Sequence, residues 1–135
     1  MIRQIKMAFM LLVPVVIVSC DGGASHASYI IKNSSNNDLY IEWYVSSRDS
    51  DRQVANLLAG ESISIHKVRY FGEQGETAPS FEIDSLTIKS ENEDGEVIYL
   101  GVNDADWEPY FEGLLDEGGS EYTWTLDVGN DVISE

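Results

Sequence analysis

Basic residues, histidine and cysteine are all scarce in this chain. Its 135 residues include eight Lys and Arg against 24 Asp and Glu, which gives a formal net charge of −16, and there are two His and one Cys. So few bases exclude non-specific binding to nucleic acid, which requires Lys and Arg to displace counterions from phosphates. One cysteine excludes an internal disulfide framework and a multi-cysteine metal site. The length is that of a single domain.

Motifs of the common enzyme classes are also missing. The sequence contains no G-x-S-x-G elbow, H-E-x-x-H pair, P-loop or dinucleotide-binding fingerprint. His26 stands in a small polar segment, and His66 stands alone in an expected strand. Pairs of carboxylates with glycosidase spacing arise by chance in so acidic a chain. We therefore expect a protein that is not an enzyme and that uses no cofactor.

The N-terminus carries the most specific pattern in the chain. Arg3 and Lys6 precede an apolar run over residues 7–18, which is shorter than the ~20 residues needed to span a membrane. A basic stretch followed by a short apolar run is typical of a secretory signal peptide. The sequence I-V-S-C at residues 17–20 then resembles the lipobox of bacterial lipoproteins. This resemblance implies cleavage before Cys20 and attachment of lipid to it, and two or more acyl chains make such an anchor durable.

The chain is accordingly divided into a lipoprotein signal peptide at 1–19, a lipidated flexible tether at 20–28 and an acidic domain at 29–135. We expect a cell-envelope protein that is anchored to a bacterial membrane through lipid on Cys20, with the outer membrane favoured and the leaflet left open. Without residues 1–19 the formal charge becomes −18. Residues 73–135 hold eighteen acids and one base, so the acidity belongs to the second half of the chain.

Hydrophobic periodicity predicts a domain built mostly of β-strands. Residues 39–45 and 122–128 alternate apolar and polar side chains, as half-buried strands do. In residues 62–71 the apolar face changes partway, which predicts a β-bulge near His66. Asp94-Gly95 predicts a two-residue type I′ hairpin turn. For residues 54–58 a helical turn and a packed loop are both open.

One segment has helical spacing. Its apolar residues fall at i, i+3, i+4, i+7 and i+8: Trp107, Tyr110, Phe111, Leu114 and Leu115. We therefore expect a mainly β fold, an antiparallel β-sandwich or open barrel of about six to seven strands, with one short helix near 106–117.

Acidic clusters and aromatic side chains are the remaining candidates for a binding site. Acids at 49/51, 91–96 and 103–108 have the chemistry of Ca²⁺ ligands, but the register fails the EF-hand template, so solvated turns are favoured and no metal site is predicted. Trp43 and Trp124 are expected in the core. The helical face of Trp107, Tyr110 and Phe111 is expected to pack there as well, which leaves Tyr40 and Tyr44 as surface candidates.

Several short motifs together resemble a known group of proteins. They are Y-I-I-K-N-S at 29–34, G-E-S at 60–62, D-S-L at 84–86 and Y-T-W-T-L at 122–126. With the lipobox, this layout resembles small lipoproteins of unknown function that are common in Bacteroidetes. The resemblance implies a β fold and an envelope location, and it carries over no functional residue other than Cys20.

These observations lead to a functional expectation with two alternatives. We expect a membrane-anchored lipoprotein that acts as a non-catalytic binding module, with a cationic protein or another envelope component as its partner and no nucleic acid. One alternative is a periplasmic immunity or inhibitor protein that neutralises a basic toxin or enzyme. The other is a surface carbohydrate-binding protein that uses Tyr40 or Trp107.

Overall fold

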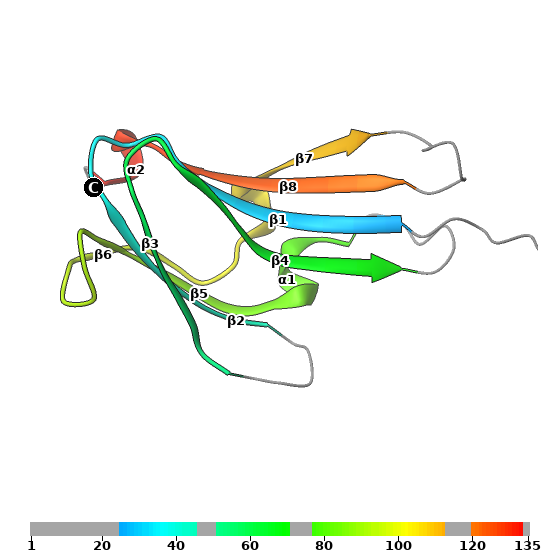
Figure 1. Cartoon of the computed structure of the whole chain (residues 1–135), viewed down its shortest axis with the longest axis horizontal. Coiled ribbons are helices and arrows are strands. Elements are labelled where there is room, and N and C mark those ends of the chain that lie inside the picture. Colours follow the sequence, from blue (N-terminus) through cyan, green and yellow to red (C-terminus); the bar gives the residue numbers. More distant parts are fainter. Residues whose placement is uncertain (1–24, 46–50, 71–76, 113–119, 134–135) are drawn as a thin grey trace, which may run out of the picture.

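Two four-stranded β-sheets make up the domain (Figure 1). The computed structural model describes residues 25–45, 51–70, 77–112 and 120–133. Its strands are β1 (Ser25–Asn33), β2 (Leu39–Val45), β3 (Gln53–Leu57), β4 (Ser62–Tyr70), β5 (Ile83–Ser90), β6 (Val97–Leu100), β7 (Trp107–Glu112) and β8 (Glu121–Val128). Short helical segments are α1 (Pro79–Glu82), the 3₁₀ turn η1 (Asp104–Asp106) and α2 (Asn130–Ile133).

The first sheet has the strand order β4-β1-β8-β7 and the second has the order β3-β2-β5-β6. All neighbouring strands are antiparallel except β1 and β8, which run parallel at the centre of the first sheet. The first and last strands of the domain therefore lie side by side. The mainly β sandwich predicted from the sequence is confirmed, and within the described residues it has eight strands.

The core lies between the two sheets, where alternate residues of the inner strands meet. Leu39 and Ile41 are fully buried and Trp43 is nearly so, which confirms the face predicted for residues 39–45. Trp124 and Leu126 of β8 are buried in the same way. Removing each such side chain from water is worth about 1.5–3 kcal/mol, so the two alternating strands contribute much of the driving force for folding.

The predicted bulge near His66 is confirmed. Tyr29 pairs with His66, whereas the next residue, Ile30, pairs with Ser64, so that Ile65 is the extra residue of β4. Ile65 is buried, and its carbonyl oxygen accepts a hydrogen bond of 2.9 Å from Nε1 of Trp43. The bulge thus provides a polar link between the two sheets as well as a bend in an edge strand.

The helix predicted near 106–117 is wrong over the part that the structure describes. Residues 107–112 form the edge strand β7, which pairs with β8, and residues 113–117 lie outside the described chain. Only Trp107 of this strand is buried, so a helical spacing of apolar residues did not reflect a helical core face. Pro109 has no N–H to donate, which suits an edge strand, and Gly113 is a poor helix former. Backbone pairing with the edge of β8 stabilises residues 107–112 as a strand instead of a helix.

Three smaller expectations also differ from the structure. The connection between β5 and β6 is longer than two residues: Ser90 N donates to Glu96 O at 2.9 Å, and positive φ occurs at Glu91 instead of at Asp94 or Gly95. Residues 53–57 form strand β3. Strand β1 begins at Ser25, so residues 25–28, which were assigned to the tether, pair within the first sheet.

Candidate functional site

The second half of the chain builds one side of the sandwich. Strands β8 and β7 follow β1 in the first sheet, and β5 and β6 follow β2 in the second. Two contacts show which strands of the two sheets face each other. Tyr99 of β6 and Val128 of β8 line the same cavity, and Trp43 of β2 donates a hydrogen bond to the backbone oxygen of Ile65 in β4. Strands β5 to β8 therefore share one side, which we call the acidic side, and β1 to β4 share the other.

The uneven charge of the sequence thereby becomes an uneven charge in space. Among the described residues, 83–133 contain twelve acids and one base, whereas 25–69 contain four acids and four bases. Most of the twelve acids are exposed: Asp84, Glu91, Glu93, Asp94, Glu96, Asp106, Glu108, Glu112, Asp127 and Asp131. One side of the molecule is thus strongly negative and the other is close to neutral.

Arg52, which directly precedes β3, reaches across β2 and contacts the β5–β6 connection. Its Nη2 lies 2.8 Å from Glu42 Oε2, 3.2 Å from Glu93 Oε1 and 3.2 Å from the Tyr40 hydroxyl. The hydrogen bond from Arg52 is the main reason that the pKa of Glu42 is lowered, and the two carboxylates in turn raise the pKa of Arg52. Arg52 thus places a positive charge beside Glu93 in this acidic turn.

The acids around η1 have structural partners as well. The Asp104 carboxylate accepts hydrogen bonds from the Ser80 backbone N at 2.8 Å and from the Ser80 hydroxyl at 2.6 Å. Asn103 accepts a hydrogen bond from Ala105 N through its side chain. Within the described residues, no group of three His, Cys, Asp or Glu side chains is placed to hold a metal ion. Asp49 of the remaining cluster lies outside the described chain.

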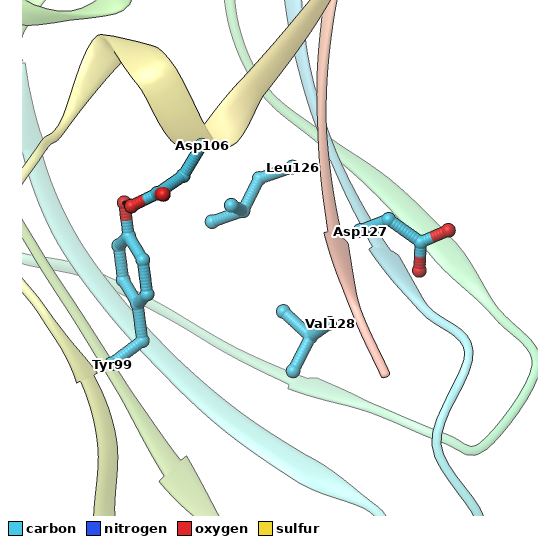
Figure 2. A pocket seen from close by; sticks show the side chains of 5 residues that line it. All are labelled: Tyr99, Asp106, Leu126, Asp127 and Val128. Carbon is cyan, nitrogen blue, oxygen red and sulfur yellow. Dashed lines mark hydrogen bonds between the residues drawn. The ribbon is translucent and has the colours of Figure 1, made fainter. Parts of the chain in front are cut away.

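A small cavity opens on the acidic side between β6 and β8 (Figure 2). Its volume is about 270 Å³, its apolar wall consists of Leu126 and Val128, and Asp127 points away from it. At its rim the Tyr99 hydroxyl donates to Asp106 at 3.1 Å, and burial is the main reason that the pKa of Tyr99 is raised. The volume falls just below the usual range for ligand pockets, so we assign it no ligand.

His66 is half-buried and connects two elements of the fold. Its ring stacks on Tyr29 with 5.9 Å between the centroids, and its Nε2 lies 3.3 Å from Glu82 Oε2. The hydroxyl of Tyr29 donates to Thr77 O at 2.9 Å. These contacts hold α1 and Thr77, two residues before it, against β1 and β4, which is a structural role. His26 lies on β1 opposite Arg69.

The exposure of the aromatic side chains differs from the expectation at several positions. Tyr40, which is expected at the surface, is only 8% exposed, whereas Trp107 is 3% exposed, as expected for a core residue, so neither offers a face for stacking sugars. Tyr110 and Phe111, which were expected in the core, are 61% and 54% exposed. Tyr44 is half-buried. Assigning 107–112 to a strand would have placed Tyr110 on the face opposite Trp107, and Pro109 was the clue available in the sequence.

Cys20, the predicted site of lipid attachment, lies outside the described residues. Among those residues, none of the helices combines the length and the apolar character that crossing a membrane requires. No known protein-family model matches the chain, and no curated protein matches it either.

Proposed function

We propose that this protein is a membrane-anchored cell-envelope lipoprotein whose domain is a non-catalytic binding module for a cationic partner. The observation that supports the binding role is the acidic side, where twelve acids and one base lie in the described residues 83–133. The anchor is inferred from the lipobox at residues 17–20, with Cys20 as the lipidated residue.

Negative charge concentrated on one side of a domain favours association with a positively charged surface. Exposed carboxylates contribute little to the stability of their own domain, whereas a complementary patch on a partner raises the rate of encounter and fixes its orientation. Glu108 suits this role because it is exposed. A basic toxin or enzyme would meet the same surface, so the immunity or inhibitor alternative uses the same side of the domain.

The carbohydrate alternative receives less support. It relied on Tyr40 and Trp107, which are buried. The hydroxyl of Tyr40 also accepts a hydrogen bond from Arg52, so this residue belongs to the network that ties β2 to the β5–β6 connection.

Salt dependence of partner capture tests the binding role. The full-length, tagged protein is purified from its own membrane in mild detergent, and its affinity for each captured partner is measured at about 50 mM and about 150 mM NaCl. We expect affinity to fall steeply with salt because exposed charges are screened beyond about 8–10 Å. Glu108→Gln should weaken binding, whereas Asp51→Asn, an exposed acid on the other side, should not. An affinity that changes neither with salt concentration nor with the Glu108→Gln substitution would contradict the proposal.

The anchor is tested separately. Cys20→Ser should abolish incorporation of a fatty-acid probe into the protein and release it from the membrane fraction. Persistent labelling of the Ser variant would refute lipid attachment at Cys20.

A further inference from the structure

We propose that Tyr110 and Phe111 of β7 sit in the interfacial layer of the bilayer to which the chain is anchored, and so seat the domain with the start of β1 toward the membrane. This inference rests on the lipid anchor of the proposed function and adds an orientation and a contact surface to it. The occupant of the surface is the lipid headgroup region of the protein's own membrane.

Only a short distance separates the anchor from the domain. Strand β1 begins at Ser25, only five positions after Cys20. A fully extended chain covers at most 3.3–3.6 Å per residue, so the lipidated cysteine lies within about 18 Å of Ser25. The end of the sandwich at which β1 begins therefore has to stay close to the bilayer surface.

The aromatic pair lies near this end of the sandwich. Phe111 pairs with Tyr122, and Tyr122 pairs with Ala27, which is two residues after Ser25. Neighbouring strands lie about 4.8 Å apart and residues rise by about 3.3 Å, so the Phe111 backbone is roughly 12 Å from that of Ser25. Figure 1 shows β7 ending at the same end of the sandwich at which β1 starts.

The chemistry of the two side chains suits a membrane interface. Tyr110 and Phe111 are 61% and 54% exposed and, as neighbours in the edge strand β7, project from opposite faces of the first sheet at its free edge. The ring of Phe111 packs against Tyr122 with 4.8 Å between the centroids. Tyrosine and other amphipathic aromatic residues favour the membrane–water interface, where an apolar ring and a polar tip are both accommodated. The other exposed large apolar side chains lie elsewhere: Val54, Leu58, Val97 and Leu100 are on or next to β3 and β6, and Phe81 is in α1.

Charge selects the kind of lipid. Glu112 is exposed directly after the aromatic pair, so it would lie among the headgroups. An anionic lipid surface repels carboxylates, whereas zwitterionic headgroups offer ammonium groups to them. The contact should therefore be deepest on bilayers of phosphatidylethanolamine and phosphatidylcholine and shallower when phosphatidylglycerol is added.

Depth-dependent fluorescence quenching tests the contact. Because the chain has a single cysteine, and lipid occupies it in the mature protein, an introduced cysteine is the only free thiol. The full-length lipidated protein carries an environment-sensitive fluorophore at Glu112→Cys or, as a control at the far end of β1, at Asn36→Cys. It is reconstituted into phosphatidylethanolamine and phosphatidylcholine vesicles that contain brominated lipid.

We expect strong quenching at position 112 and little at position 36. Adding Tyr110→Ser and Phe111→Ser should reduce quenching at 112 to the level at 36, and Tyr110→Ser alone should give an intermediate value. Circular dichroism confirms that each variant is folded. Equal quenching at both positions, or quenching at 112 that survives the double substitution, would overturn the membrane contact.

Loss of the membrane contact and loss of the lipid anchor give different results. Loss of the membrane contact leaves the unlabelled protein floating with the vesicles and still carrying the fatty-acid probe. A protein that neither floats nor takes up the probe contradicts the anchor itself.

Discussion

The side chain of Asn33 is fully buried at the end of β1, and both its amide oxygen and its amide nitrogen have partners. Its Nδ2 donates to Asn37 O at 2.8 Å and to Leu57 O at 3.1 Å. Its Oδ1 accepts from Ser35 N at 3.1 Å and from the Ser35 hydroxyl at 2.6 Å. One polar residue thereby ties the turn between β1 and β2 to the end of β3.

We predict that Asn33→Ala lowers the free energy of unfolding by about 3 kcal/mol, because it leaves several buried polar groups without their partner. Asn36→Ala, three residues along the same turn, removes an exposed side chain and should change stability by less than about 0.5 kcal/mol. Urea denaturation followed by tryptophan fluorescence measures both. Similar losses in the two variants would show that the buried network is not what stabilises the turn.

At the scale of elements, the β5–β6 connection depends on close backbone packing at Gly95. A Cβ atom built at this position overlaps the carbonyl oxygen of Ser90, whereas one built at Gly60 meets no atom within 4 Å. Gly60 instead has a positive φ of 83°. The two glycines are therefore needed for different reasons, the first for space and the second for backbone conformation.

We predict that Gly95→Ala destabilises the domain by about 2–3 kcal/mol, because the loop has to move to relieve the overlap. Gly60→Ala should cost about 1 kcal/mol, the ordinary penalty for a left-handed non-glycine residue. The movement at Gly95 should also disturb the contact between Arg52 and Glu93, which chemical-shift changes around Arg52 would report. A Gly95→Ala variant as stable as the wild type would show that the loop adapts freely.

Pairing between elements explains why residues 107–112 form a strand although their spacing predicts a helix. A pattern of i, i+3, i+4 apolar residues in a short segment fits a helix face, yet alternate positions of this segment also fit an edge strand. Trp107 opposite Leu126 fills the core in the strand arrangement, and Glu108 and Tyr110 face outward. Local spacing alone does not distinguish the two outcomes, because the deciding hydrogen bonds come from β8, far along the chain.

At the scale of the whole molecule, the acidic side implies repulsion within the folded domain. The described residues 83–133 hold twelve acids and one base on strands that share one side of the sandwich. Lys32 and Asp127 form one ion pair across β1 and β8, 3.8 Å apart and solvent-exposed, which is worth little. Self-repulsion of this kind weakens the compact state and is screened by salt.

We predict that the melting temperature rises as NaCl is increased from about 20 mM to about 300 mM. Glu108→Lys should stabilise the domain by about 0.5 kcal/mol at low salt, because it places a base among acids. Asp51→Lys, on the other side and next to Arg52, should give no such gain. Calorimetry at the two salt concentrations measures these effects, and a melting temperature that falls with added salt would contradict the assignment of repulsion to this side.

The sequence by itself determined the class of fold, the alternating core strands, the bulge near His66 and the asymmetry of charge along the chain. Each of these depends on the nature and spacing of neighbouring residues, since a strand with one buried face has to alternate. Tertiary structure decided what depends on distant partners: that 107–112 is an edge strand, that Tyr40 is buried beneath Arg52, and that Tyr110 is exposed. It also brought β5 to β8 together, so that an acidic half of the sequence became an acidic side of the molecule.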